Sequence, residues 1–285
     1  MDHLEGRTAF ITGGASGLGF AMAKAFAGAG MKIAIADVED GALEKAVAAL
    51  KEANADVIGI KLDVRDREAM DAAAAETKAA FGNVHLLVNN AGIGAGGPVQ
   101  DMTHDDWDWT IGVNLNGVVN GVQSFLKDMI AHGEGGHVVN TASMAGIFGA
   151  PGMSAYCATK FAVVGMSESM NADLAETNVG VSVLCPAFVK TNIFDSARNR
   201  PAELADTVER ERTPEMEAMA EEIMRTAQEP DDVAQRVLEA VREERFWIFT
   251  HGELKDMVRM RGEMLLGEFP EPAPGAVPVV PPSAN

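Results

Sequence analysis

Residues 12–19 read TGGASGLG. They follow an apolar run at 8–12 and open a helix-like segment at about 16–29. Glycine permits a tight turn between strand and helix and lets the backbone approach a phosphate closely. The N-terminus of the helix adds unpaired N–H groups and the positive end of its dipole. The stretch therefore predicts a strand–turn–helix unit that binds the pyrophosphate of a dinucleotide.

The glycine spacing separates this loop from other glycine-rich motifs. A P-loop has Lys directly after its last glycine, where this chain has Phe20. A nucleophile elbow has glycine two residues after its serine, where this chain has Leu18. We therefore expect the loop to contact a cofactor through Gly13, Ser16, Gly17, Leu18 and Gly19.

Apolar runs rich in β-branched residues recur along the chain and alternate with helix-like segments. The runs are 8–12, 32–36, 57–62, 86–89, 137–141, 181–185 and 246–250. The helix-like segments are 16–29, 40–53, 66–80, 103–131, 154–178 and one that starts near 231. Near-continuous apolar strands are typical of a parallel sheet covered on both faces, and the alternation indicates right-handed βαβ units. The expected fold class is α/β: a Rossmann-type, doubly wound parallel sheet of about seven strands.

The remaining segments complete the predicted domain organisation. We expect a single dinucleotide-binding catalytic domain at 5–265, with residues 190–229 inserted as a substrate lid, because long connections in compact domains commonly carry function. The proline-rich tail at 266–285 is expected to be either an extended arm on a neighbouring subunit or disordered; the sequence leaves both open.

Composition excludes several classes of function. The net charge of −19 argues against nucleic acid and against anionic membranes as partners. No apolar run is long enough to cross a bilayer, and the acidic start resembles no signal peptide, so a cytoplasmic location is expected. The six histidines lack metal-ligand spacing, so no metal site is predicted. Cys157 and Cys185 form no CxxC pair and are expected to be buried thiols.

Polar or small residues follow three of the predicted strands, at the sheet edge where open α/β sheets bind ligands. Asp37 ends the second run, where a carboxylate can accept hydrogen bonds from adenosine ribose hydroxyls and repel a 2′-phosphate. The plainer alternative is an Asp that caps the following turn. The first reading favours NAD over NADP. The other cofactor contacts expected at this edge are Asp63, Val64, Asn90, Ala91 and Gly92.

Residues 156–160, YCATK, hold the predicted chemistry. Tyr156 and Lys160 are four residues apart and so share one helix face, where the ammonium can lower the pKa of the phenol toward that of a general base. Ser143 follows the fifth run, where its hydroxyl can hold a substrate oxygen. Asn114 is polar within an apolar helix. On residue chemistry alone it is equally well a satisfied core amide.

Taken together, these motifs resemble the short-chain dehydrogenase/reductase family, in its compact single-domain branch, from about Glu5 to Thr250. The resemblance implies Tyr156 as acid/base, Ser143 as substrate orienter, and Lys160 as the residue that lowers the Tyr pKa and binds the nicotinamide ribose. It also implies that Asn114 anchors a relay water, that Val189 and Thr191 contact the nicotinamide, and that the chain assembles as a homotetramer or homodimer through 103–131 and 154–178. One departure is Pro186-Ala187, where the family usually has Pro-Gly.

The expected reaction is hydride transfer between NAD(H) and a secondary alcohol or ketone. Residues 108–117 resemble those of bacterial enzymes that oxidise benzylic alcohols, and the expected pocket rim is apolar, which favours a bulky hydrophobic or aryl substrate. That rim comprises Met144, Ile147, Phe148, Met153, Phe188, Ile193 and Phe194. Two alternatives stay open: a catalytically silent NAD(H)-sensing binding protein, and an isomerase or dehydratase of the extended branch, against which the TGxxxGxG spacing speaks.

Overall fold

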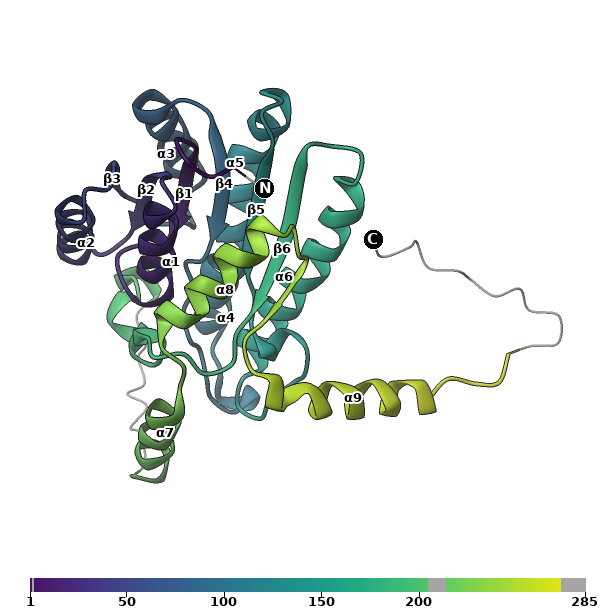
Figure 1. Ribbon diagram of the computed structural model, residues 1–285. Helices are drawn as coiled ribbons and strands as arrows, with labels where there is room; N and C mark the ends of the chain where they lie inside the picture. Colours follow the sequence, from purple (N-terminus) through teal and green to yellow (C-terminus); the bar gives the residue numbers. More distant parts are fainter. Residues whose placement is uncertain (2, 205–213, 273–285) are drawn as a thin grey trace. The chain divides into compact units, whose positions relative to one another are not determined.

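The computed structural model describes residue 1, residues 3–204 and residues 214–272 (Figure 1). Its contacts divide the chain into two compact units, Met1–Thr250 and His251–Asn285. The first unit holds the whole sheet and all the predicted site residues. Of the second, the described part contains a short 3-10 turn and helix α9 (Lys255–Gly267).

The first unit is built on a seven-stranded, fully parallel sheet in the order β3-β2-β1-β4-β5-β6-β7. The strands are β1 (Thr8–Thr12), β2 (Lys32–Asp37), β3 (Val57–Lys61), β4 (Val84–Asn89), β5 (Gly136–Thr141), β6 (Val179–Cys185) and β7 (Trp247–Phe249). The strand order reverses between β1 and β4, which creates the crevice where doubly wound sheets bind dinucleotides. The predicted fold class is confirmed.

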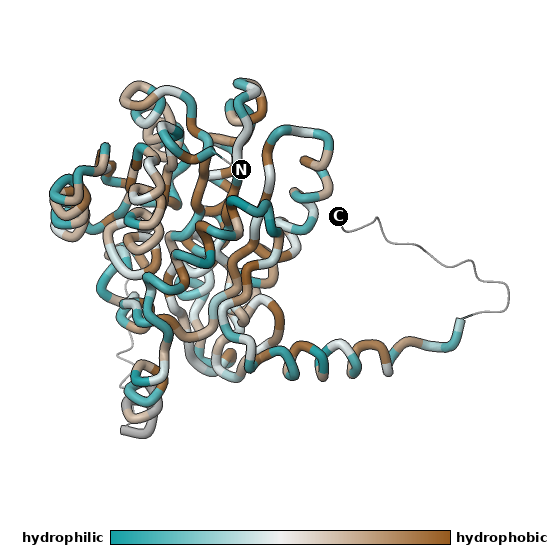
Figure 2. Tube along the Cα trace, in the orientation of Figure 1, coloured by the Kyte–Doolittle hydropathy of each residue, from teal (hydrophilic) through white to brown (hydrophobic). Residues whose placement is uncertain are grey.

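Helices cover both faces of the sheet (Figure 1). On one face lie α1 (Gly17–Gly28), α2 (Asp40–Glu52) and α8 (Pro230–Arg242), whose apolar side chains share a core cluster with Ile33 and Ile35 of β2. On the other lie α3 (Arg67–Phe81), α5 (Gly117–Ala131) and α6 (Ser154–Asp173), which pack with the alternate residues Ala34 and Ala36. Figure 2 shows these central strands as strongly hydrophobic, as burial on two faces requires.

Two predicted helices differ from the observed ones. The segment predicted as one helix at 103–131 is α4 (His104–Ile111), a π-helical turn η2 (Gly112–Asn116) and then α5. The side-chain amide of Asn114 pairs with the backbone of Ile93 at this turn, an interaction that helix periodicity cannot reveal. The predicted helix at 154–178 ends at Asp173, because the chain turns there toward β6.

The predicted lid insertion at 190–229 contains elements that its sequence did not indicate. They are the 3-10 helices η4 (Asn192–Asn199) and η5 (Ala202–Leu204) and the helix α7 (Pro214–Thr226). Residues 205–213 of the insertion, and the tail from 273 onward, lie outside the described residues. The division between the two units falls after Thr250, whereas the predicted domain extends to 265. The lid and tail assignments stay predictions.

His137 is a fully buried histidine on β5, and it makes the fold sensitive to acid. Its Nε2 lies 2.7 Å from the Ser182 hydroxyl, which itself donates to the Arg245 carbonyl, so the ring must donate to Ser182. Burial lowers the pKa of His137 to about 4 from an ordinary 6.5. Protonation therefore favours the unfolded chain, and stability from this group is lost as pH falls from 6.5 toward 4.

Between pH 7 and pH 4 we expect this histidine to cost about 3 kcal/mol of the free energy of unfolding. Denaturant unfolding of the wild type and of His137→Gln, measured at both pH values, compares two proteins with the same carboxylates. Of these, the Glu244 carboxylate interacts with the charge of His137, so its interaction is part of the measured difference. The wild type should lose more stability than the variant by that amount. Parallel losses would show that His137 does not titrate in this window.

Candidate active site

The glycine-rich loop joins β1 to α1 in a closely packed turn. Gly13 and Gly17 adopt positive φ angles of 64° and 50°, the left-handed region that side chains disfavour. At Gly19, an added Cβ would lie 2.0 Å from the Gly13 carbonyl oxygen and 2.6 Å from Asn90 Nδ2. The loop therefore leaves no room for a side chain at Gly19. Its backbone stays open at the start of α1, where a pyrophosphate can be held.

Asp37 ends β2 beside this loop. Its Oδ2 accepts a hydrogen bond of 3.0 Å from the Ala15 N–H, and its Oδ1 accepts one of 3.1 Å from the Glu39 N–H. Burial raises the pKa of Asp37, while these N–H donors act to lower it. The carboxylate is thus fixed against the loop, at the sheet edge where open α/β sheets bind ligands.

Asp63, after β3, is engaged by an arginine. Arg65 Nη2 and Nε donate to Asp63 Oδ2 at 2.7 and 3.0 Å. Burial acts to raise the pKa of Asp63, but hydrogen bonds from the Arg65 side chain and backbone outweigh it, so the pKa is lowered. Asp63 is therefore ionised at neutral pH, and one edge of its carboxylate is already occupied.

Asn90, after β4, is hydrogen-bonded to the glycine-rich loop. Its Nδ2 donates to the carbonyl oxygens of Thr12 at 3.0 Å and Gly13 at 3.3 Å. The hydroxyl of Thr12 accepts the backbone N–H groups of Asn90 and Ala91 at 2.9 and 3.0 Å. Thr12 and Asn90 thus connect the loop after β1 to the loop after β4 across the strand-order reversal.

Tyr156 and Lys160 lie on one face of α6, as their spacing predicted. Lys160 Nζ lies 5.6 Å from the centroid of the Tyr156 ring and donates to the Thr141 carbonyl at 2.9 Å. The sequence predicted that Lys160 lowers the pKa of the Tyr156 phenol. Burial instead raises this pKa to about 12, and Ser143 is the residue that acts to lower it. Burial lowers the pKa of Lys160 to about 8. At neutral pH Tyr156 is therefore a neutral phenol, and the Lys160 amine beside it is mostly in its protonated, positively charged form.

Ser143 follows β5 and is held on both sides. Its Oγ accepts the Ala145 N–H at 3.1 Å and lies 3.3 Å from the Pro186 carbonyl oxygen. Ser143 and Tyr156 line the same cavity, and Ser143 acts to lower the pKa of the phenol, so both hydroxyls are placed to contact a substrate oxygen there. Pro186 is in turn bonded by the Met144 N–H at 2.9 Å, so the Pro-Ala departure from the family pattern leaves this contact in place.

Asn114 lies at the π-helical turn between α4 and α5 and is fully buried. Its Oδ1 accepts the Ile93 N–H at 2.8 Å, and its Nδ2 donates to the Ile93 carbonyl at 2.9 Å. Both halves of the amide are thus used to hold the loop after β4. A π turn shifts the backbone hydrogen-bond pattern and is frequent at functional sites. The side chain itself does not reach the cavity.

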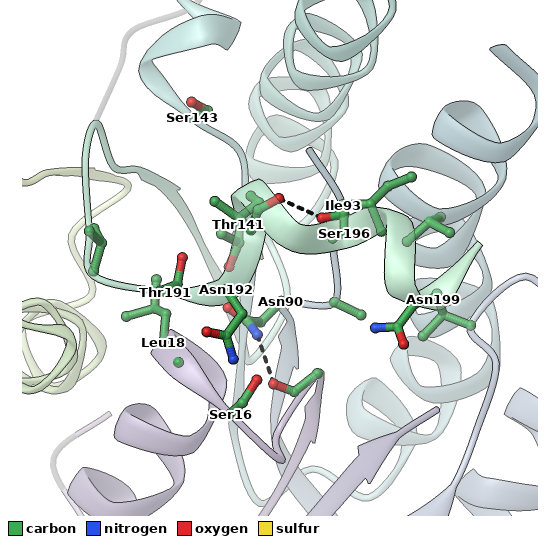
Figure 3. Close-up of a pocket in the computed structure, with 18 of the residues that line it drawn as sticks. Ser16, Leu18, Asn90, Ile93, Thr141, Ser143, Thr191, Asn192, Ser196 and Asn199 are labelled. Carbon is green, nitrogen blue, oxygen red and sulfur yellow. Dashed lines mark hydrogen bonds between the residues drawn. The ribbon is translucent and has the colours of Figure 1, made fainter. Parts of the chain in front are cut away.

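One cavity of about 230 Å³ brings most of these residues together. Among the predicted site residues, only Gly19 and Asn114 do not line it; each lies directly behind a residue that does. The predicted residues that line it are Gly13, Ser16, Gly17, Leu18, Asp37, Asp63, Val64, Asn90, Ala91, Gly92, Ser143, Tyr156, Lys160, Val189 and Thr191. Figure 3 shows several of them around the cavity, with Thr191, Asn192, Ser196 and Asn199 across the middle of the view, between Ser143 and Ser16.

The apolar rim is smaller than predicted. Phe188, Ile193 and Phe194 line the cavity, and both phenylalanines are more than 40% exposed. The other four predicted rim residues do not line it. Met144 is buried, and Met153 packs with Ile193 against the cluster that contains Tyr156.

Several residues of the site were missed by sequence reasoning. Thr12 could have been found, because it ends the strand that precedes the glycine loop. The contribution of η4 carried no recognisable motif. Ser196 accepts the Gly94 N–H at 2.9 Å and donates to the Ile193 carbonyl at 2.6 Å, which seats η4 on the loop after β4 (Figure 3).

Comparison with known proteins identifies the family of this chain. The family model described as short chain dehydrogenase matches residues 7–202. The chain belongs to the short-chain dehydrogenase family. It is 41% identical over 259 residues to a C alpha-dehydrogenase of Sphingobium sp. strain SYK-6, covering 90% of this chain and 84% of that protein.

Solved structures of this family share the whole fold. A short chain dehydrogenase/reductase from Burkholderia phymatum in complex with NAD is 40% identical, with a TM-score of 0.91 over 97% of this chain and 100% of that one. The apo form of LigD from Sphingobium sp. strain SYK-6 is 35% identical, with a TM-score of 0.79 over 94% and 99%.

As a short-chain dehydrogenase, this chain is an oxidoreductase that acts on CH–OH groups with a nicotinamide dinucleotide. The residues present fit such a cofactor. The close contacts at Gly19 leave no room for a side chain. Backbone N–H groups lie at the start of α1, and the Asp37 carboxylate is bonded to the loop beside them. Within the described residues, no helix is both long and apolar enough to span a membrane. The same residues contain no group of three or more His, Cys, Asp or Glu arranged to hold a metal ion.

Proposed function

We propose that this short-chain dehydrogenase interconverts bulky, hydrophobic secondary alcohols, aryl alcohols in particular, and their ketones, with NAD(H) as cofactor and Tyr156 as acid/base. One observation carries the proposal. Tyr156, Ser143 and Lys160 line one cavity together with Asp37, and Lys160 Nζ lies 5.6 Å from the centroid of the phenol ring.

Tyr156 is the group proposed to move the proton. With its pKa raised to about 12 by burial, the phenol is a donor at neutral pH, the form needed to protonate a ketone oxygen during reduction. In the opposite direction it must accept the alcohol proton, and a nearby positive charge favours phenolate. Lys160 supplies that charge, fixed in place by the Thr141 carbonyl. When bound, the nicotinamide dinucleotide gives or takes the hydride.

Ser143 and Asn114 have supporting roles in this proposal. Ser143 is held by the Ala145 N–H, so its hydroxyl can orient the substrate oxygen toward Tyr156. Both polar atoms of the Asn114 side chain are hydrogen-bonded to the Ile93 backbone. Any contribution of Asn114 to a proton relay therefore comes from the backbone of the π turn rather than from its side-chain amide. Gly92 lies beside Asn114 and Lys160: a Cβ added at Gly92 would be 3.3 Å from Asn114 Oδ1 and 3.6 Å from Lys160 Nζ.

The proposed NAD preference rests on charge. Asp37 and Glu39 line the cavity beside the glycine loop, where a 2′-phosphate would meet two carboxylates. A ribose diol can instead donate hydrogen bonds to Asp37. The NAD named in the Burkholderia phymatum complex supports this choice.

The proposed substrate class rests on the exposed aromatic residues at the cavity. Phe188 and Phe194 offer apolar surface without charge, and Ile193 joins them next to Tyr156. A flat hydrophobic substrate would cover these rings, whereas a sugar or hydroxy acid would leave its polar groups unpaired. The Sphingobium relative is named a C alpha-dehydrogenase, which supports a dehydrogenase reaction at carbon. We further propose that 190–204 and 214–229 act as the substrate lid and that the chain is a homotetramer or homodimer.

A paired activity screen tests the proposal. Initial rates are measured on aryl secondary alcohols, aliphatic secondary alcohols and sugar alcohols, each with NAD and with NADP. We expect kcat/KM to be at least about tenfold higher for aryl than for sugar alcohols and higher with NAD than with NADP, since each 1.4 kcal/mol of binding changes the ratio tenfold. Tight NADH binding without turnover on any compound would instead favour the silent NAD(H)-sensing alternative.

A further inference from the structure

Glu39 and Arg198 form an ion pair that fastens the outer wall of the cavity to the sheet. Arg198 Nη2 donates to Glu39 Oε1 at 2.7 Å, and Asn199 Nδ2 donates to the same oxygen at 2.8 Å. Glu39 lies two residues after the end of β2. Arg198 and Asn199 are the last two residues of η4. All three residues line the cavity, and the side chains of the pair are only about 30% exposed.

The same carboxylate region contains the proposed ribose site. The backbone N–H of Glu39 donates to Asp37 Oδ1, so the two acids follow each other around one turn. Hydrogen bonds from Arg198 and Asn199 lower the pKa of Glu39, which keeps it ionised at neutral pH. This part of the cavity therefore holds two carboxylates and one guanidinium, and the guanidinium is already paired.

We propose that Glu39 is a second determinant of dinucleotide choice, because it occupies Arg198 and so prevents this arginine from binding a 2′-phosphate. The inference rests on the proposed NAD preference and extends it to a pair of residues outside the glycine loop and outside Asp37. Here Glu39 is a specificity-determining residue, and Arg198 is a latent phosphate ligand.

Glu39 and a bound 2′-phosphate would compete for one guanidinium. A phosphate monoester carries about −1.5 to −2 charge at pH 7, and arginine binds such groups through paired N–H donors. While Glu39 holds Arg198, an incoming phosphate must displace a carboxylate and also meets the charge of Asp37. With both acids replaced by their amides, Arg198 is the remaining charge of the three.

Arg198 would stay in place without Glu39. Its Nη1 donates to the carbonyl oxygens of Asp195 at 2.6 Å and Asn192 at 3.1 Å, so η4 itself holds the guanidinium. A glutamine at position 39 retains an oxygen that Asn199 can bond. We therefore expect Glu39→Gln to fold and to keep η4 seated, while the carboxylate bonded to Arg198 Nη2 is removed. The exposed Asp195 carboxylate stays, with its Oδ2 at the longer distance of 3.9 Å from Arg198 Nη1.

The test is equilibrium binding of NADH and NADPH, followed by nicotinamide fluorescence, which does not depend on turnover. The proteins are wild type, Asp37→Asn, Glu39→Gln, the double variant, and the double variant that also carries Arg198→Gln. We expect NADPH affinity to rise about tenfold in Asp37→Asn and about 100-fold in the double variant. Adding Arg198→Gln should return it to the Asp37→Asn level.

Arg245→Gln in the double variant is the matched control, because Arg245 forms a comparable pair with Glu243 at 2.6 Å and does not line the cavity. It should leave the gain intact. If Arg198→Gln also leaves the gain intact, the inference is wrong. Loss of both cofactors in Glu39→Gln would equally overturn it, by showing a structural role. A wild type that binds NADPH as tightly as NADH would contradict the proposed NAD preference itself, a separate readout.

Discussion

Tyr156→Phe is expected to lower kcat by about 10²–10⁴-fold while leaving NADH affinity within about twofold of the wild type, since acid–base catalysis by one group commonly supplies that factor. The substitution removes only the hydroxyl. The ring stays in its buried cluster with Met153 and Ile193, and Lys160 keeps its bond to the Thr141 carbonyl. Initial rates and NADH fluorescence titration measure the two quantities separately.

Ser143→Ala serves as the graded comparison. It removes the second hydroxyl of the cavity wall but leaves the proton-carrying group, so we expect a smaller loss of kcat than for Tyr156→Phe. An active Tyr156→Phe protein, with kcat within a few-fold of the wild type, would rule out the proposed acid/base. Loss of NADH binding with the hydroxyl would instead place Tyr156 in cofactor binding alone.

Gly19→Ala is expected to weaken NADH binding by at least about 100-fold, which corresponds to roughly 3 kcal/mol. The new methyl group would lie 2.0 Å from the Gly13 carbonyl, a backbone atom, and 2.6 Å from Asn90 Nδ2. The loop must therefore shift away from α1, and the Asn90 bonds that hold it must break. NADH titration and thermal unfolding of the same sample separate lost binding from lost folding.

Gly28→Ala is the matched control on the same helix. An added Cβ at Gly28 meets no atom within 4 Å, so we expect unchanged NADH affinity and equal or slightly higher stability, because alanine favours helix over glycine. If Gly19→Ala bound NADH like Gly28→Ala, the glycine cradle would not be the cofactor site.

The sheet and most of the proposed site could be predicted because their signals are local. Apolar runs bounded by helix-like segments gave all seven strands to within two residues at each end, since a strand buried on both faces has few alternatives. The glycine loop, Asp37 and the Tyr156–Lys160 pair depend on spacing within one turn or one strand end. Parallel strands then bring such ends to one edge without further information.

The rest depended on contacts between distant segments. The π turn at Asn114 is set by its pairing with Ile93, 21 residues earlier, and the helix pattern of 103–131 reads through it unchanged. The Glu39–Arg198 pair joins residues 159 apart, and an ion pair of that kind has no sequence pattern. The four rim residues that do not line the cavity show a related limit, because apolar composition does not distinguish a pocket wall from the core behind it.

The most direct test of the central claim is to follow the hydrogen from a secondary aryl alcohol deuterated at its carbinol carbon, with NAD and the wild-type protein. We expect the deuterium to appear in the NADH formed, and the rate to fall when the alcohol is deuterated if this step limits turnover. In Tyr156→Phe the transfer should slow by about 10²–10⁴-fold. NADH that forms without deuterium, or bound NAD that is never reduced, would contradict the assignment of the Tyr156 cavity as a site of alcohol oxidation.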